Sequence, residues 1–241
     1  MPVLRPMIPI SDDNPARYPA FVTWSLIVLC VVTYLWERSL GGDMRVALNA
    51  LGFVPATYFS LRLTEPGDLG FPPAVTILTS MFLHGGILHL AGNMLYLWIF
   101  GNNVEDAVGH FRFLLFYVLC GVGAALAMAY IDPGSRAPMV GASGAISGVL
   151  AAYVLFFPRA RVTVIVPLGI IPYPFALPAI WVIGFWFILQ LVSAWVPNAA
   201  QPGTAWWAHL GGFAVGLLLA PILKPSIAGI STPSSRGPWE R

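Results

Sequence analysis

The chain has 241 residues, of which 58% are hydrophobic and only 9% are charged, and its mean hydropathy is +0.78. Soluble domains carry about 25% charged residues, so this composition excludes a soluble domain and indicates a membrane protein. The formal net charge is +2 and the 12 Lys and Arg residues are scattered singly, which argues against nucleic acid as a partner.

Five uncharged runs are long enough to cross a bilayer. A bilayer core of about 30 Å needs roughly 20 apolar residues in a helix. The runs contain 19 to 62 residues and cover 18–36, 69–104, 113–131, 137–158 and 162–223. They are apolar on every side, unlike the alternating strands of an outer-membrane barrel. The sequence therefore predicts an all-α, polytopic membrane protein.

The first four spans are expected at 20–38, 82–102, 112–131 and 141–157. Between the first two lies a long loop, whose uncharged stretch 46–61 contains Asn49, Gly52 and Pro55. We expect this stretch to form short interfacial helices rather than a span. The fourth span is rich in Gly and Ala, so we expect it to be central and to pack on its neighbours through Gly144 and Gly148.

The last uncharged run is interrupted by four prolines between residues 167 and 178. They favour an interfacial or re-entrant segment at 162–176, although a seventh span there remains an alternative. Helices at about 178–196 and 205–223 complete a bundle of six spans. The expected organisation is a cytoplasmic N-terminal segment (1–19), a six-transmembrane-helix domain (20–224) and a cytoplasmic C-terminal tail (225–241).

The distribution of basic residues predicts the orientation. With six spans both termini share one side, which holds eight of the Lys and Arg residues, whereas the other side holds four. Because cytoplasmic loops carry the excess of positive charge, we expect both termini to be cytoplasmic. We expect an integral protein of a bacterial inner (plasma) membrane.

Few polar side chains fall inside the expected spans, and such groups are costly in lipid and usually functional. They are His84, His89 and Asn93 in the second span, Ser143 and Ser147 in the fourth, Gln190 and Ser193 in the fifth, and His209 in the sixth. Spans two, four and six run in the same direction, from the outer side inward. Their polar groups are therefore expected roughly 3 to 17 Å below the outer boundary, at a rise of about 1.5 Å per residue.

These residues together favour nucleophilic catalysis. Ser143 follows Gly141 and Ala142 at the start of a helix, where free N–H groups favour negative charge. His209 can act as the general base that takes the serine proton. His89 and Asn93 are spaced i, i+4 on one helical face and can donate hydrogen bonds to an oxyanion. Each signal alone is more often a matter of helix packing, and only the joint pattern is specific.

Other membrane chemistries fit the sequence less well. A transporter is expected to bury carboxylates, but every Asp and Glu lies outside the assigned spans or at their ends. The His-Glu-x-x-His motif of metalloproteases is absent, and so is a pair of membrane aspartates. We therefore expect neither a metal nor a cofactor.

Three motifs in this order, HGGILHLAGN (84–93), GASGAISG (141–148) and AHLGGFAVG (208–216), resemble the rhomboid family of intramembrane serine proteases. The resemblance implies a six-helix rhomboid-like bundle and a Ser-His dyad of Ser143 and His209. It also implies an oxyanion pair of His89 and Asn93, with His84 as the family's loop histidine and Gly141 as an auxiliary residue. The implied partners are transmembrane protein substrates, cleaved near their outer ends, and the lipid bilayer.

The sequence departs from some family members at two places. The Trp-Arg pair of some bacterial members is missing from AVTILTSMFLH (74–84), and Ser147 stands where some carry an aromatic ring that stacks on the base. We therefore expect Trp206 or Trp207 to orient His209. The alternative function is a non-catalytic rhomboid-like binding protein or membrane chaperone. Such relatives typically lose the serine or the histidine, and this chain keeps both.

Overall fold

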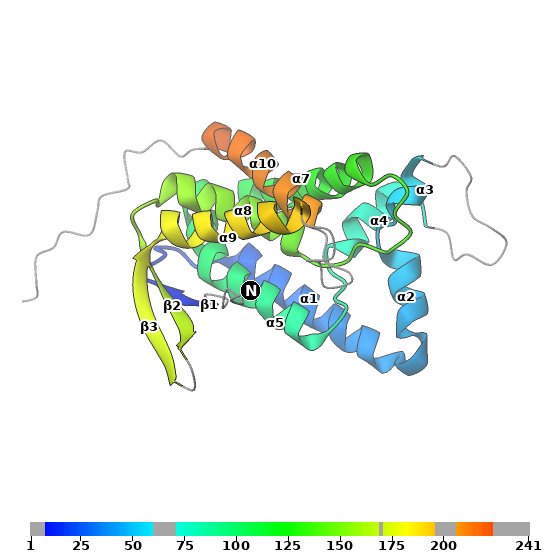
Figure 1. Cartoon of the computed structure of the whole chain (residues 1–241), viewed down its shortest axis with the longest axis horizontal. Helices are drawn as coiled ribbons and strands as arrows, with labels where there is room; N and C mark the ends of the chain where they lie inside the picture. The colour runs from blue at the N-terminus through cyan, green and yellow to red at the C-terminus, as the bar shows by residue number, and fades with distance from the viewer. Residues whose placement is uncertain (1–7, 60–70, 169–170, 196–205, 224–241) are drawn as a thin grey trace, which may run out of the picture.

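Helices dominate the computed structural model, which describes residues 8–59, 71–168, 171–195 and 206–223 (Figure 1). The helices are α1 (Phe21–Ser39), η1 (Gly41–Asp43), α2 (Met44–Leu51), α3 (Pro55–Phe59), α4 (Pro73–Ser80), α5 (Ile87–Tyr96), η2 (Leu97–Gly101), α6 (Asn102–Val108), α7 (His110–Ile131), α8 (Ser143–Phe156), α9 (Ala179–Trp195) and α10 (Trp206–Leu223). The mostly helical fold is confirmed. The expected tail, 225–241, lies outside the described residues.

Each of the six predicted spans coincides with a helical segment. Among the described residues, α1, α7 and α10 are long and apolar enough to cross a membrane, and α8 and α9 are shorter apolar helices. The helical part of the region expected as the second span, 82–102, consists of α5 and η2, and α6 continues them to Val108 without a break. In the described part of the stretch 46–61, which ends at Phe59, the chain forms the short helices α2 and α3, as its Gly and Pro predicted.

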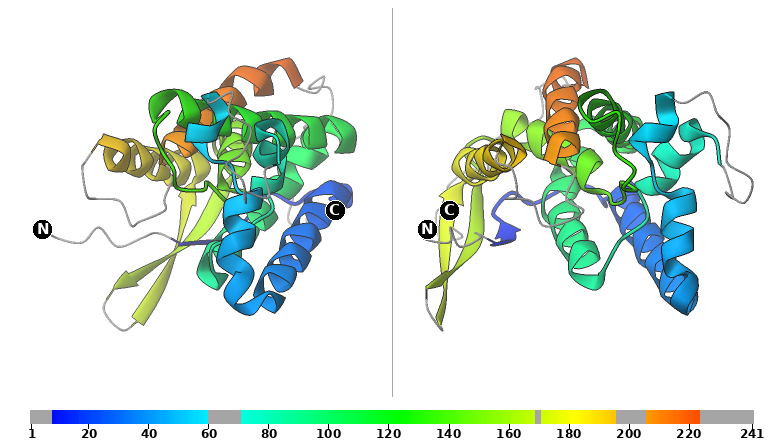
Figure 2. Two further views of the ribbon diagram at one scale, coloured as in Figure 1. Left: turned by 90° about the vertical axis from the view of Figure 1, so that its right-hand side faces the viewer. Right: turned by 45° about the vertical axis from the view of Figure 1, so that its right-hand side comes forward.

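A three-stranded antiparallel sheet corrects the all-α prediction. Its strands are β1 (Ile8–Asp12), β2 (Arg161–Leu168) and β3 (Ile171–Pro178), in the order β1-β2-β3. Figures 1 and 2 show it at the end of the molecule opposite to α2, α3 and α4. The described residues of the segment 162–176 thus form two paired antiparallel strands, and not a seventh helical span.

The composition of this segment explains why it forms strands. After Arg161, β2 continues with the β-branched run Val-Thr-Val-Ile-Val, whose alternate residues Val162 and Val164 are fully buried. Three of the four prolines lie on the edge strand β3, an even number of residues apart, so their nitrogens face the same edge. An edge strand tolerates such prolines because no ladder hydrogen bond is lost.

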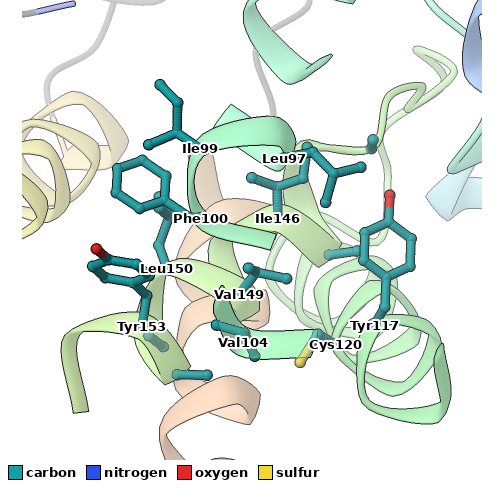
Figure 3. Close-up of a cluster of buried hydrophobic side chains, with 14 of the residues drawn as sticks. Leu97, Ile99, Phe100, Val104, Tyr117, Cys120, Ile146, Val149, Leu150 and Tyr153 are labelled. Atoms are coloured by element: carbon teal, nitrogen blue, oxygen red, sulfur yellow. The ribbon is translucent and has the colours of Figure 1, made fainter. Parts of the chain in front are cut away.

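Helix α8 is central, as its small residues predicted. Residues Gly144 to Tyr153 are all buried, and Figure 3 shows Ile146, Val149, Leu150 and Tyr153 among side chains from neighbouring helices. A Cβ at Gly144 would lie 2.6 Å from Ala124 Cβ, and one at Gly148 would lie 2.3 Å from Cys120 Sγ. Both glycines therefore allow α7 to approach α8 closely, which confirms their packing role.

A buried carboxylate fixes the far end of the α5–α6 segment. Glu105 on α6 is 1% exposed and accepts hydrogen bonds from the backbone N–H groups of Val22 and Thr23 at 2.8 and 2.7 Å. The Thr23 hydroxyl donates to the same carboxylate at 2.7 Å. These are first-turn amides of α1, where negative charge is favourable, so Glu105 ties α1 to α6.

Candidate active site

Ser143 and His209 are in contact because the first turns of α8 and α10 meet. Ser143 is the first residue of α8, and His209 lies in the first turn of α10. Ser143 Oγ lies 2.8 Å from His209 Nε2, although the two residues are 66 positions apart in sequence. An imidazole nitrogen at hydrogen-bond distance from a hydroxyl can take its proton as the oxygen attacks an electrophile.

The backbone that leads into Ser143 depends on Gly141. Gly141 has a φ of +121°, which residues with a side chain rarely adopt, and its N–H donates to the carbonyl of Ser80 at 2.8 Å. Since α8 begins at Ser143, the amides of its first turn have no acceptor within the helix. These amides and the helix dipole favour a negatively charged ligand beside Ser143.

His89 and Asn93, both on α5, lie against this backbone. A Cβ at Gly141 would stand 2.7 Å from Cε1 and Nε2 of His89 and 3.4 Å from Nδ2 of Asn93. Asn93 Nδ2 is buried and has no hydrogen-bond partner among the described residues. A buried donor without a partner is uncommon and is available to a ligand. The structure therefore places an amide donor and an imidazole beside Gly141, which precedes Ser143 by two residues in the chain.

His84 lies outside the helix in which the sequence placed it. The second span was expected to begin at residue 82, but residues 81–86 form the turn between α4 and α5. His84 is fully buried, with Nδ1 3.1 Å from the carbonyl of Phe82 and its ring 5.3 Å from the ring of His89. The structure thus places the ring of His84 next to the ring of His89, in the turn that precedes α5.

Glu37, which sequence reasoning passed over, supports the same turn. This carboxylate in the last turn of α1 is fully buried and accepts the backbone N–H of His84 at 3.0 and 3.3 Å. The available signal was an acidic residue at the end of an otherwise apolar span. The contact holds the turn that leads to His89 and Asn93.

His209 is oriented by side chains from α9 and by a ring on its own helix. Its Nδ1 lies 2.7 Å from Oε1 of Gln190, which is 6% exposed. The rings of Trp186 and Trp206 each lie 6.0 Å from the imidazole. Sequence reasoning noticed Gln190 as a polar residue within a span but gave it no role.

Comparisons with known proteins identify the family of this chain. The family model of the rhomboid domain matches residues 73–226, more than half of the chain. The chain belongs to the rhomboid family. It is 29% identical over 235 residues to the rhomboid protease AarA of Providencia stuartii, with 90% of this chain and 79% of that protein covered.

Two further rhomboid relatives match shorter regions. The rhomboid protease GluP of Bacillus subtilis is 46% identical over 76 residues, which cover 32% of this chain and 14% of GluP. The mitochondrial rhomboid protein 1 of Saccharomyces cerevisiae is 31% identical over 153 residues, which cover 60% of this chain and 40% of that protein. The chain thus spans less than half the length of these two relatives.

The expected departures of this rhomboid can now be placed. Ser147 is fully buried, and its hydroxyl donates to the carbonyl of Ser143 at 2.7 Å, within its own helix. Trp206 lies beside His209, whereas Trp207 lies 5.6 Å from the ring of Trp195. Of the two expected tryptophans, Trp206 contacts the imidazole, together with Trp186.

A cavity of about 200 Å³ adjoins the rhomboid site. Its walls come from α5, η2, α8 and α9 and include Tyr96, Phe100, Leu150, Trp186 and Gln190. The walls are mostly apolar, and Gln190 is their link to His209. Within the described residues, no three His, Cys, Asp or Glu side chains converge in a way that could hold a metal ion.

Proposed function

We propose that this chain is an intramembrane serine protease whose dyad is Ser143 and His209. The observation that carries the proposal is the 2.8 Å contact between Ser143 Oγ and His209 Nε2 at the N-terminal turn of the buried helix α8. Membership of the rhomboid family and the similarity to proteins named rhomboid protease support it.

The proposed reaction begins with proton transfer within the dyad. His209 Nε2 takes the Ser143 proton as Oγ forms a bond to the carbonyl carbon of the scissile peptide. The imidazolium then gives this proton to the departing amine as the C–N bond breaks, which leaves an acyl-enzyme on Ser143. A water molecule, deprotonated by the same nitrogen, hydrolyses the ester and restores the serine hydroxyl.

The developing oxyanion is proposed to be stabilised by Asn93 Nδ2, His89 and the Ser143 amide. Asn93 Nδ2 is a buried donor without a partner among the described residues, and His89 lies beside it against Gly141. Donors that are already desolvated and aimed need little reorganisation when charge appears, which is why such sites lower the barrier.

The membrane arrangement is part of the proposal. Six segments (α1, α5 with η2 and α6, α7, α8, α9 and α10) cross a bacterial inner membrane, with both termini cytoplasmic. Ser143, His209 and His89 lie in the first turns of α8, α10 and α5, and Asn93 lies one turn further along α5. In this orientation those first turns face the outer side, so transmembrane protein substrates are cut near their outer ends.

A fluorophosphonate probe tests the function directly. We expect it to label the purified, detergent-solubilised protein at Ser143, and Ser143→Ala to abolish the labelling. The labelled protein should also lose cleavage of a transmembrane reporter substrate. A well-folded protein that neither reacts with the probe nor cuts the reporter, yet retains bound transmembrane helices, would instead support the non-catalytic chaperone.

A further inference from the structure

Gln190 bonds to the nitrogen of His209 that faces away from Ser143. Oε1 of Gln190 lies 2.7 Å from Nδ1, while Nε2 of the same ring lies 2.8 Å from Ser143 Oγ. The three side chains, from α9, α10 and α8, therefore form one hydrogen-bonded chain. This arrangement has the connectivity of a triad, with an amide at the position of the acid.

The amide oxygen determines which nitrogen of His209 carries the proton. A carbonyl oxygen only accepts hydrogen bonds, so Nδ1 must carry the hydrogen that it donates to Gln190. Neutral imidazole has one N–H, and Nε2 is then left with a free lone pair towards the Ser143 hydroxyl. The opposite tautomer would place a hydrogen on Nε2, and His209 could not accept the serine proton.

The surroundings of Gln190 make an amide more suitable than a carboxylate. Gln190 is 6% exposed, on a helix without any charged residue, and the nearby rings are those of Trp186 and Trp206. A fixed negative charge in this environment would carry a large desolvation cost. The amide dipole orients the ring and accepts from the imidazolium without adding a charge.

We propose that Gln190 is a positioning residue that completes a Ser143–His209–Gln190 relay. The inference rests on the proposed protease function and goes beyond the dyad that the family resemblance implies. Gln190 acts through His209: it holds the tautomer and the ring orientation, and it stabilises the protonated ring that forms during the reaction. Its loss is therefore expected to affect the chemical step rather than the binding of substrate.

Three variants test this role. Gln190→Met keeps the length of the side chain but removes the strong acceptor, and Gln190→Glu keeps an acceptor oxygen in either protonation state. Leu189→Met is the matched control, since Leu189 lines the same cavity on the same helix. The readouts are kcat and KM on a reporter substrate, the rate of fluorophosphonate labelling, and the melting temperature.

We expect Gln190→Met to lower kcat and the labelling rate by at least about tenfold, a part of the roughly 10² to 10⁴ that a general base contributes. KM should change by less than about threefold. Gln190→Glu should keep kcat within about fivefold of the wild type, because an acceptor still faces Nδ1, and Leu189→Met should leave every readout unchanged.

The outcomes separate this inference from the proposed function. If the wild type is labelled at Ser143 and Gln190→Met is labelled equally fast, the relay is overturned while the protease remains. A loss of kcat that Gln190→Glu does not restore likewise overturns it. A fall in melting temperature with kcat intact would make Gln190 a structural residue only. Failure of the wild type to react with the probe removes both proposals.

Discussion

The carbonyl oxygen of Gly144 occupies the space that a side chain at position 212 would need. A Cβ built on Gly212 would lie 1.9 Å from that oxygen, and one on Gly216 would lie 2.5 Å from the carbonyl oxygen of Gly148. Helices α8 and α10 are therefore in direct backbone contact at two places, one helical turn apart. Gly144 adjoins Ser143, and Gly212 follows His209 by three residues, so the same contact sets the distance between the proposed nucleophile and its base.

We therefore expect Gly212→Ala to separate Ser143 from His209. The added methyl group meets backbone atoms that cannot yield locally, so it should cost about 1–3 kcal/mol of stability and most of the activity. The matched control is Gly184→Ala on α9, where a Cβ would meet nothing within 4 Å. That control should be neutral or slightly stabilising, because Ala is the better helix former by about 1 kcal/mol. Thermal unfolding and reporter cleavage in detergent measure both effects, and an active Gly212→Ala enzyme would show that the dyad tolerates a wider helix spacing.

Ser143→Ala and His209→Ala are each expected to abolish cleavage of a transmembrane reporter without unfolding the protein. The two side chains act as one unit, so the double variant should be no worse than either single variant. The check is a comparison of kcat/KM for the three variants at matched melting temperatures. Substantial activity in either single variant would remove that residue from the proposed mechanism.

Glu37 is expected to support the oxyanion site from a distance. Glu37→Leu removes the acceptor of the buried His84 amide, and an orphaned buried donor costs about 1–3 kcal/mol. We expect a lower melting temperature together with a lower kcat, since the affected turn leads into His89. Glu37→Gln keeps one acceptor oxygen, so its melting temperature and its kcat should both stay close to those of the wild type. Equal behaviour of the two variants would mean that the contact with His84 contributes little.

A contact between the sheet and the central helix predicts how stability depends on pH. The hydroxyl of Tyr153, on α8, donates to Asp12 Oδ2 on β1 at 2.5 Å. Burial raises the pKa of Asp12 to about 6, and the neighbouring Asp13 adds to this effect. Because the pKa in the folded state lies above the ordinary value, the folded protein holds more protons at acidic pH, and the contribution of Asp12 to stability is lost as pH rises through about 6.

Asp12→Asn removes this dependence and keeps an acceptor for Tyr153. We expect the melting temperature of the variant, relative to that of the wild type, to be higher at pH 7.5 than at pH 4.5. Ser11→Ala, an uncharged change on the same strand, should show no such trend. An equal difference at both pH values would mean that Asp12 is not desolvated in the folded protein.

The helical segments and the convergence of the site residues were accessible from the sequence for a physical reason. Long uncharged runs report helices directly, and polar residues are so costly in lipid that the few present mark a site. The four site residues come from three separate regions of the chain: His89 and Asn93, Ser143, and His209. Each lies a short distance after the start of a predicted span, so their similar depth in the membrane could be predicted from that distance. Gly144 and Gly148, four residues apart, likewise indicated that their helix is central in the fold.

The sheet and the supporting contacts were not accessible in the same way. β1 and β2 are about 150 residues apart and pair through the backbone, which leaves no periodic signal in either segment alone. The prolines of β3 were correctly taken as evidence against a helix but do not specify an edge strand. The roles of Gln190 and Glu37 depend on which atom each side chain reaches, and spacing along one helix does not contain that information.

Substitution of Asn93 tests whether this residue is a catalytic hydrogen-bond donor or a structural one. Its Nδ2 is buried and unpaired among the described residues, so it is expected to be used when the oxyanion forms. Asn93→Ala should then lower kcat by up to about 10² to 10³-fold with little change in KM, the range for loss of one oxyanion donor. A loss of about tenfold still fits, because His89 and the Ser143 amide remain.

If Asn93 instead stabilises contacts between helices, the same change should cost about 0.6 kcal/mol of stability and leave kcat nearly intact. Asn49→Ala, the same chemical change at an exposed site on α2, controls for the effect of the substitution itself. Measuring kcat, KM and the melting temperature on one preparation of each variant distinguishes the two roles. A normal kcat with a lowered melting temperature would remove Asn93 from the oxyanion site, and the unpaired Nδ2 would then need another ligand.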